Sequence, residues 1–464
     1  MTDATPVIDR LAALCQDFAL PAASAQGQAH ARALLLDTLG CALAARSHAA
    51  VVKAAVAAQA LAQGDAATGL GSGRRRAVLG AILDTGAAIR ALDFNDFYWG
   101  PGIGGHPSDL FAVSLALAES TQADLGQLLE ATIVGYALYL RLLDRMAPDG
   151  AFDHTTAMTL GAAAIAARLG RLDRSATGHA LAMALVRGPS LSAMRHGAIS
   201  EAKATAPAVA AISGVIAAQL AQAGISGPVA ACLGPVGLAG WLGPEQDIAG
   251  LAGPGPLDAH LLGVSIKRFP CIGTAQAAVA GALALREQAR ALGASIRSVD
   301  VQLVRTALIE HQTSAAYARP RDRETADHSF FSLLALALCD GDLQPAQFAA
   351  RRYGDADVVD MSTRLRFGYE LQRRAPGLFP ARLEATLDDG RRITADVPYP
   401  PGHPQHPLDR AALLAKWQAL TADCLAPATA HTIAELCLHA PASHSVSDLI
   451  HPLALAGRSL ERTA

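Results

Sequence analysis

Apolar residues recur at helical spacing over most of the chain. In the first half, nine segments carry them three and four positions apart, and turn residues such as Gly150, Gly170 and Gly224 separate several of these segments. Alanine fills the remaining faces; it is the best helix former, and its small side chain lets helices pack closely. We therefore predict that the first half is almost entirely helical. The predicted helices cover residues 8–20, 28–45, 49–63, 75–92, 108–120, 124–144, 155–169, 175–188 and 203–224.

The pattern changes after residue 262. The segment SIRSVDVQLVRTAL alternates apolar and polar residues and contains β-branched side chains, which is typical of a strand. The segment ARLEATLDDGRRITADVPYP predicts two strands joined by a turn at Asp388-Asp389-Gly390. After the linker PYPPGHPQHPLD, residues 407–461 return to helical spacing.

These patterns predict a mainly α fold. The simplest assembly is a large all-helical domain built from both chain ends, residues 1–262 plus 403–464, with a smaller α/β domain inserted at 263–402. Three consecutive modules are the alternative. A chain of 464 residues also exceeds the roughly 250–300 residues at which single cores stop growing, which favours two domains.

The charge of the chain bears on its partners. The formal net charge is −3, so there is no basic field to attract nucleic acid or an anionic membrane, and we expect neither partner. Residues 204–244 carry no charge, but Pro207, Pro228 and Pro235 interrupt this Ala- and Gly-rich run. We therefore interpret it as a buried helix rather than a membrane span, which needs about 20 uninterrupted apolar residues.

The seven cysteines lie far apart, and no two show the C-x-x-C spacing of a zinc or redox site. Reduced thiols are thus expected, and because the first residues lack a basic segment followed by an apolar one, we predict a cytoplasmic protein. The histidines form no HExxH motif; the nearest approach to a ligand cluster is His403 with His406. We expect no metal and no other cofactor.

Polar clusters interrupt this apolar chain in five places, and an active site is expected where they meet. The longest, ALDFNDFYWGPGIGGHPSD over residues 91–109, combines aspartates, aromatics, glycines and a histidine. The others are FDHTT at residues 152–156, Lys203, KRFPC at residues 267–271 and RPRDRETADH at residues 319–328.

In this order, the clusters resemble the MmgE/PrpD family, which includes 2-methylcitrate dehydratase, cis-aconitate decarboxylase and iminodisuccinate epimerase. The resemblance rests on LLDTLGCALAA, on ALDFNDF with the later HPSD, and on FDHTT followed by LGAAAIAARLGRLD. It implies a helical domain of both chain ends, an inserted α/β lid, a homodimer and a cofactor-free cleft. By motif, it implies catalytic roles for Asp93, His106, His154, Lys203 and Lys267.

The chain departs from the family pattern at two positions. Thr274 stands where the family usually has a histidine, and Ser332 stands where it usually has a tyrosine. Neither segment is expected to offer a nearby histidine or tyrosine instead. The further candidates for substrate binding are Asp96, Tyr98, Cys271 and Thr274; for Cys271 a buried, unreactive thiol is the simpler interpretation.

The residue types fit one chemistry. A small polycarboxylate that loses water, loses CO₂ or inverts at a carbon develops negative charge, so its site needs cations and a base with a pKa near neutrality. We expect His106, oriented by Asp93 or Asp96, to be that base, and His154 at a helix N-terminus to have a lowered pKa. Alternatively, His106 is a structural hydrogen bonder, and His154 merely neighbours the residue that caps its helix.

Lys203 and Lys267 are flanked by apolar sequence and need an anionic partner, either the substrate or a structural carboxylate. The leading hypothesis is a cofactor-independent lyase that resembles 2-methylcitrate dehydratase and acts on a small di- or tricarboxylate. The alternatives are an epimerase, isomerase or decarboxylase of a related dicarboxylate, or a catalytically altered member that binds a carboxylate.

Overall fold

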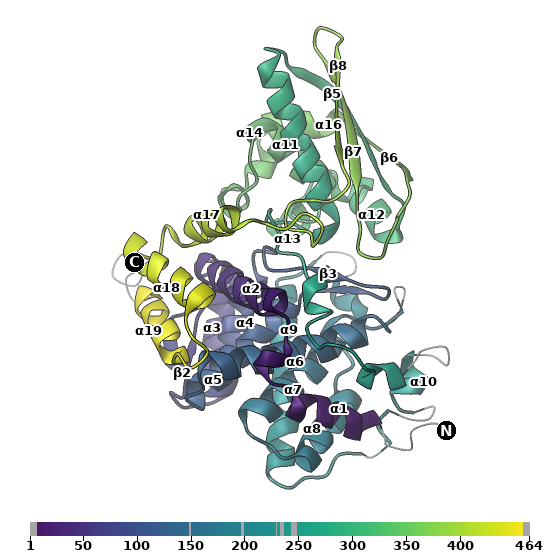
Figure 1. Cartoon of the computed structure of the whole chain (residues 1–464). Coiled ribbons are helices and arrows are strands. Elements are labelled where there is room, and N and C mark those ends of the chain that lie inside the picture. Colours follow the sequence, from purple (N-terminus) through teal and green to yellow (C-terminus); the bar gives the residue numbers. More distant parts are fainter. Residues whose placement is uncertain are drawn as a thin grey trace.

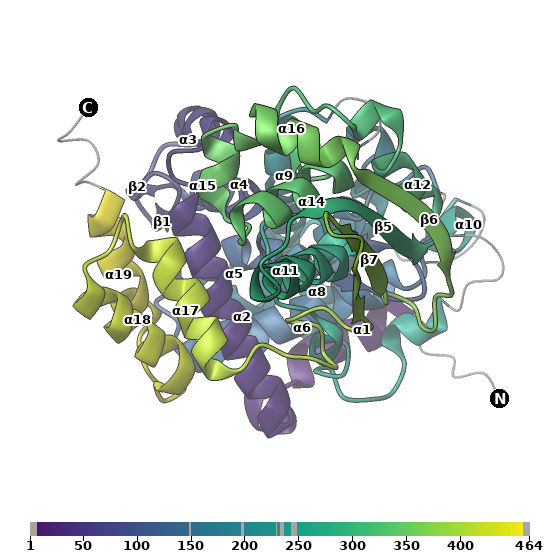
Figure 2. The ribbon, with the colours of Figure 1, turned by 90° about the horizontal axis from the view of Figure 1, so that it is seen from above.

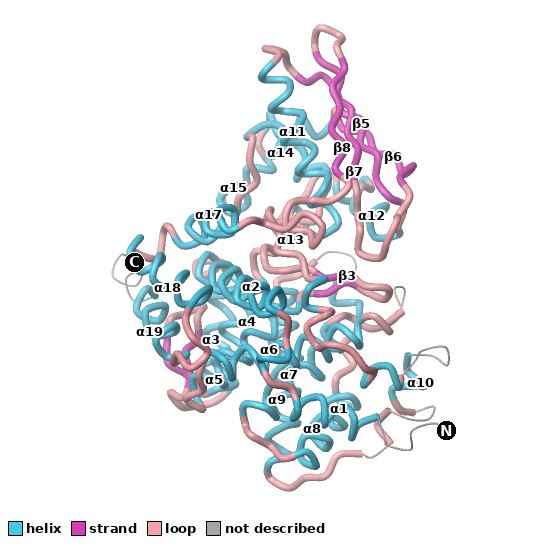
Figure 3. Tube along the Cα trace, viewed as in Figure 1, coloured by secondary structure: helices cyan, strands magenta, loops and turns pink. Residues whose placement is uncertain are grey.

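The structure of the protein, a computed structural model, describes residues 7–147, 150–195, 199–228, 230–232, 236–242 and 248–457. The prediction of a mainly helical chain is confirmed. Figure 1 shows a large helical body below and a smaller body with a sheet above. Figure 3 shows that the longer strands lie in the smaller body.

Within the described residues, the helical body begins with ten helices. The first nine match the nine predicted segments closely, because each buries one face, and the short tenth helix was not predicted. Helix α7 lies near its centre and packs against α5, α6, α8 and α9, while α9 also packs against α4. These helices are α1 (Val7–Asp17), α2 (Ala25–Ala44), α3 (Ala49–Leu61), α4 (Val78–Arg90), α5 (Phe111–Ser120), α6 (Leu125–Leu143), α7 (Thr155–Leu169), α8 (Arg174–Arg187), α9 (Ala202–Gln222) and α10 (Leu238–Leu242). Two short hairpins join them: β1 (Ala67–Gly69) with β2 (Arg74–Arg76), and β3 (Tyr98–Trp99) with β4 (Gly104–Gly105).

Helix α9 begins the uncharged stretch of the sequence. Within the described residues it is the single helix long and apolar enough to cross a membrane, and 56% of its apolar window is buried inside the protein. Helices α4, α7 and α8 pack against α9. Its apolar composition is therefore that of a buried core helix, as predicted from the sequence.

The C-terminal segment returns to the helical body. It forms α17 (Arg410–Thr421), α18 (Pro427–His439) and α19 (Val446–Gly457). Helix α17 packs against α2, and Trp417 belongs to the same hydrophobic core as Leu35. The buried Lys416 forms an ion pair of 2.6 Å with Asp37 of α2. The two chain ends therefore share one core.

The smaller body is built on a four-stranded sheet in the order β6-β5-β7-β8. Strand β5 (Ile296–Val304) runs parallel to β6 (Leu365–Leu371) and antiparallel to β7 (Ala381–Leu387), which pairs with β8 (Arg392–Val397). The predicted β7–β8 hairpin is confirmed; Gly390 in its turn has a φ of +86°, which glycine adopts without strain. The strand β6 was not predicted.

Helices cover this sheet and complete a second core. Helix α11 packs over β7 and β8, and α14 packs against α11 and α16, as Figure 2 shows from above. The second core runs from Phe269 to Ala395 and is separate from the first. The helices are α11 (Gln276–Ala291), α12 (Ala307–Gln312), α13 (Arg323–Ala326), α14 (Phe330–Asp340), α15 (Pro345–Ala349) and α16 (Ala356–Thr363).

The two segments that connect the bodies run side by side. The N–H of Ile266 donates to the carbonyl of Gly402 over 3.1 Å. Gly402 has a φ of +90°, and a Cβ atom there would lie 1.8 Å from the carbonyl oxygen of Ile266. Only glycine fits this crossing, which lies directly beside Lys267.

Candidate active site

A cavity of about 240 Å³ lies between the two bodies. Both bodies contribute to its lining, so the site is complete only when they are in contact. The lining residues that carry charge or an imidazole are Arg90, Asp93, His106, Asp153, His154 and Lys203 from the helical body, and His311 and His328 from the smaller body.

The loop after α4 places Asp93 at the bottom of this cavity. Asp93 has a φ of 49°, a left-handed conformation that aspartate and asparagine adopt more readily than most residues. The loop then forms the β3–β4 hairpin and reaches His106, after which Pro107 begins a short helical turn. The glycines of β4 and the turn at Asp93 bring Asp93 and His106 to the same cavity.

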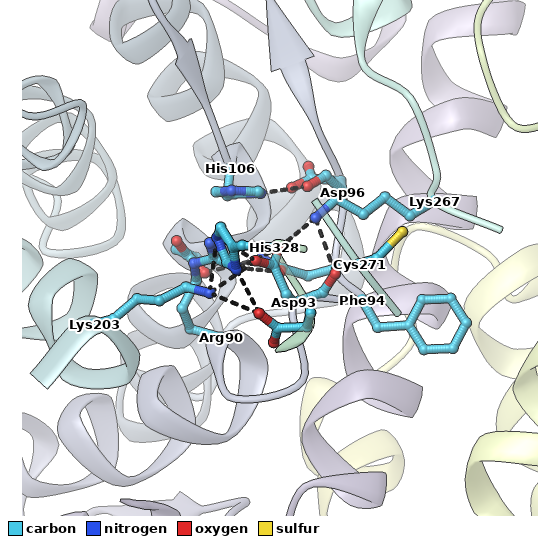
Figure 4. Close-up of polar contacts among 12 residues, drawn as sticks. Arg90, Asp93, Phe94, Asp96, His106, Lys203, Lys267, Cys271 and His328 are labelled. Carbon is cyan, nitrogen blue, oxygen red and sulfur yellow. Dashed lines mark hydrogen bonds and ion pairs between the residues drawn. The ribbon is translucent and has the colours of Figure 1, made fainter. Parts of the chain in front are cut away.

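Asp93 is the centre of a buried network of ion pairs (Figure 4). Its Oδ1 accepts hydrogen bonds from Arg90 at 3.0 Å and from Lys267, and its Oδ2 accepts one from Lys203 at 2.9 Å. Lys267 also donates to the backbone carbonyl of Asp93 over 2.9 Å. Although burial opposes ionisation, Arg90, Lys203 and Lys267 hold the pKa of Asp93 well below its usual range.

The smaller body contributes two residues to this network. The Nδ1 of His328 is hydrogen-bonded to the carboxylate of Asp327, and its Nε2 lies 3.3 Å from the Nζ of Lys203. Lys203 is also 3.8 Å from Asp327. Burial and the neighbouring Lys203 lower the pKa of His328. Asp327 and His328 therefore dock the smaller body onto the floor of the cavity.

The ligand atoms of Asp93, Asp327 and His328 lie within 4.8 Å of one another, as in a possible metal site. Amino and guanidinium groups already occupy the space around Asp93, and Lys203 lies next to both remaining residues. A divalent cation would have to displace or repel these buried cations, so the group is better described as an ion-pair network.

The ring of His106 is held in one tautomer. Its Nδ1 lies 2.7 Å from the backbone carbonyl of Asp96, which can only accept, so Nδ1 carries the proton and Nε2 is the basic atom. Burial, Arg90 and Lys267 lower the pKa of His106 well below its usual value, which keeps the ring neutral and departs from the pKa near neutrality expected of the base. The expected orienting group was a carboxylate. The structure uses the main chain instead, because the Asp96 carboxylate accepts from the Ser108 hydroxyl at 2.6 Å.

His154 precedes α7 and faces His106, with ring centroids 5.6 Å apart. Its Nδ1 lies 2.9 Å from the hydroxyl of Tyr139, which also accepts from the backbone N–H of His106 at 3.2 Å. Burial raises the pKa of Tyr139 well above its usual range, so the phenol keeps its proton. Within the described contacts His154 Nδ1 is the acceptor for that proton, which places the His154 proton on Nε2. The two histidines thus adopt opposite tautomers.

The side chain that caps helix α7 is that of Asp153, not that of His154. The carboxylate of Asp153 accepts from the backbone N–H of Thr155 at 3.1 Å and from its hydroxyl at 2.8 Å. The capping role that the sequence left open thus belongs to Asp153, while His154 lines the cavity.

The structure separates the remaining sequence candidates. Thr274 lines the cavity and donates to Gln312 over 3.2 Å. Lys267 is buried behind Asp93, and its anionic partner is the carboxylate of Asp93. Lys203 also forms an ion pair with Asp93, but unlike Lys267 it lines the cavity. Asp96, Tyr98 and Cys271 do not line the cavity.

The side chains of Asp96, Tyr98 and Cys271 instead lie within the protein structure away from the cavity. Burial raises the pKa of Asp96 to about 7. The hydroxyl of Tyr98 donates to Asp144 over 2.9 Å, which anchors the β3–β4 hairpin to the end of α6. The thiol of Cys271 is buried against Gln276, and burial raises its pKa.

The sequence-based prediction gave no site role to several residues near or in the site, although Asp327 and His328 lay in one of its polar clusters: Arg90, Tyr139, His311, Tyr317, Asp327 and His328. The expectation that no histidine or tyrosine is at hand is wrong, since His328 and Tyr317 both line the cavity. His328 lies within the very segment DHSFFSLL, whereas Ser332 lines a different cavity in the smaller body. In the sequence, the neighbouring Asp327 was the feature that could have marked His328 as a site residue.

The fold and the site define a mainly helical protein of two bodies with a cavity lined by buried charged residues and histidines between them. Comparison with protein families agrees. The model of the MmgE/PrpD N-terminal domain matches residues 9–250, and that of the MmgE/PrpD C-terminal domain matches residues 269–440. The chain belongs to the MmgE/PrpD family, whose members are generally enzymes of the dehydratase and isomerase type. The resemblance seen in the motifs is thereby confirmed.

Proposed function

We propose that the protein is a cofactor-independent lyase that removes a proton next to a carboxylate of a small substrate, as 2-methylcitrate dehydratase does. The observation that carries this proposal is the pair of facing histidines, whose hydrogen-bond partners assign a basic Nε2 to His106 and a protonated Nε2 to His154. Such a pair can accept a proton at one point and donate a hydrogen bond at another.

The proposed reaction begins at His106. Its Nε2 takes the proton from the carbon beside the substrate carboxylate, and the Asp96 carbonyl stabilises the resulting imidazolium through Nδ1. His154 donates from Nε2 to the oxygen on which negative charge develops, while Lys203 lies close by. In a dehydration, the imidazolium of His106 then returns its proton to the departing hydroxyl, so that water leaves and both histidines are neutral again.

Two related reactions are the alternatives. Return of a proton to the opposite face of the carbanion gives an epimerase. In a decarboxylase, loss of CO₂ itself forms the carbanion, which then takes a proton from a histidine of the site. The cavity suits all three because each reaction passes through a species with extra negative charge, which His154 and Lys203 can stabilise.

The smaller body is proposed to act as a lid. Asp327 and His328 complete the network around Lys203, so movement of this body would open the cavity and expose Asp93. We also propose a homodimer, as the family resemblance implies, which light scattering on the purified protein would test. The cytoplasmic location expected from the sequence stays a proposal.

The reaction can be identified by NMR in deuterated water with citrate-like, aconitate-like and aspartate-like acids and with short 3-hydroxy acids. New alkene signals would indicate a dehydratase, deuterium incorporation without net conversion an epimerase, and loss of a carboxyl carbon a decarboxylase. If the protein neither converts any of these acids nor exchanges their protons, the proposal of proton abstraction is wrong.

A further inference from the structure

We infer that the cavity accepts one carboxylate at its floor and an apolar substituent along its outer wall, so that the preferred substrates are monocarboxylates rather than di- or tricarboxylates. This inference rests on the proposed function, because it assigns a substrate class to the same site.

The first argument is the balance of charge. Among the described lining residues, Arg90 and Lys203 are cations, and Asp93 and Asp153 are anions, so their formal charges cancel. Behind them, Lys267 and Asp327 add one charge of each sign. A tricarboxylate would bring three negative charges into a buried site whose own charges already sum to zero, and buried charges require partners.

The second argument is the small number of cationic hydrogen-bond donors that remain available to a substrate carboxylate. Lys203 is bonded to Asp93 and lies beside Asp327 and His328. Arg90 donates from Nη1 to Asp93 at 3.0 Å and to Asn95 at 3.2 Å (Figure 4 shows Arg90 and Lys203 beside Asp93). Within the described part of the chain, Nε of Arg90 is buried without a hydrogen-bond partner, Nη2 makes none of the described hydrogen bonds, and Arg90 lines the cavity. The floor therefore has one guanidinium edge for a single carboxylate.

The third argument is the composition of the outer wall. The lysine, arginine and aspartate side chains of the lining are almost completely buried, whereas the apolar lining residues, apart from the buried Ile272, are half-buried or exposed and so lie nearer the opening. These apolar residues are Phe97, Trp99, Ile103, Phe152, Ile199 and Leu308. Trp99 is fixed by Phe379, with ring centroids 5.2 Å apart, so this wall is preformed. It would cover an apolar group. The described lining residues include no lysine or arginine on this wall to pair with a second carboxylate, although Ser192, His311 and Tyr317 also line the cavity.

Hexanoate and adipate test the inference because they have the same chain length and differ in one terminal methyl or carboxylate group. Isothermal titration calorimetry with the purified protein near neutral pH should show hexanoate binding at least about tenfold more tightly than adipate, the expected effect of one unpaired carboxylate.

A substitution in the wall sharpens the test. Leu308, which is 39% exposed, can be replaced by arginine without loss of core packing, and Leu308→Arg should shift the preference toward adipate by about tenfold or more. Leu292 is 42% exposed on the far end of α11, so Leu292→Arg adds the same charge outside the cavity and should leave both affinities unchanged.

The inference is overturned if wild-type protein binds adipate as tightly as hexanoate, binds neither, or responds to Leu292→Arg as it does to Leu308→Arg. Proton exchange in deuterated water separates this outcome from failure of the proposed function. Exchange on dicarboxylates with no preference for monocarboxylates would refute the substrate class alone. The predicted preference for hexanoate without exchange on any acid would refute the catalytic role alone.

Discussion

Replacing Asp93 with asparagine should destabilise the protein strongly without disturbing its backbone. Asparagine tolerates the left-handed conformation of Asp93 as well as aspartate does, so the substitution isolates the charge. It leaves Arg90, Lys203 and Lys267 buried around a neutral amide, with Asp327 still 3.8 Å from Lys203.

The magnitude follows from the burial of the network. The side chains of Asp93 and Lys203 are 2% and 6% exposed, so solvent screens them little. Removing one partner of a buried ion pair destabilises by about 3–5 kcal/mol. With roughly 2–3 °C per kcal/mol for a body of this size, the melting temperature should fall by about 6–15 °C.

Thermal unfolding followed by circular dichroism measures this effect. The matched control is Asp389→Asn, which removes an exposed aspartate that also contacts an arginine, Arg391, and should leave the melting temperature unchanged. Because the pKa of Asp93 is lowered in the folded state, its contribution is fully present above its unfolded pKa of about 3.9 and is lost as pH falls toward the folded value. The difference between wild type and Asp93→Asn should therefore shrink below about pH 4. Equal melting temperatures near neutrality would refute the ion-pair network.

Three further predictions concern other parts of the molecule. Tyr139→Phe removes the donor to His154 and should lower kcat by about tenfold with little change in KM, as expected for one lost hydrogen bond; an unchanged kcat would contradict the tautomer assignment. Because burial raises the pKa of Cys271, iodoacetamide should not modify it in the native protein near neutral pH, as mass spectrometry can show; labelling as fast as in unfolded protein would contradict this. Limited proteolysis near residue 262 or 402 should leave the N- and C-terminal flanks associated, since they share one core; free release of the C-terminal fragment would argue for separate modules.

The helices were predictable because each buries one face, and a buried face imposes a period on the sequence. The predicted segment 155–169 coincides with α7, and 124–144 with α6, to within about one residue. The strand β6 was missed because its residues, LRFGYEL, are mostly half-exposed and carry no regular alternation. The return of helical spacing after the linker predicted that the C-terminal segment rejoins the first domain, and the two chain ends do share one core.

The site was predictable only where a motif marked it. His106 and His154 stood in unusual polar clusters, and both line the cavity. Arg90 ends an ordinary apolar helix, and Tyr139 lies within another, so their roles depend on tertiary contacts that local sequence does not encode. The orientation of Asp96 depends on Ser108, twelve residues later.

The central claim is that His106 transfers the substrate proton, and the variant His106→Ala tests it most directly. Its matched control is His30→Ala, because the ring of His30 also bonds a backbone carbonyl, that of Val264 at 2.9 Å, but lies outside the cavity. Proton exchange in deuterated water and the melting temperature should be measured on both variants. We predict that His106→Ala lowers the exchange rate by about 10²–10⁴-fold with little change in melting temperature, while His30→Ala keeps its exchange rate per folded molecule. Near-normal exchange in His106→Ala, or an equal loss of exchange in both variants, would contradict the account.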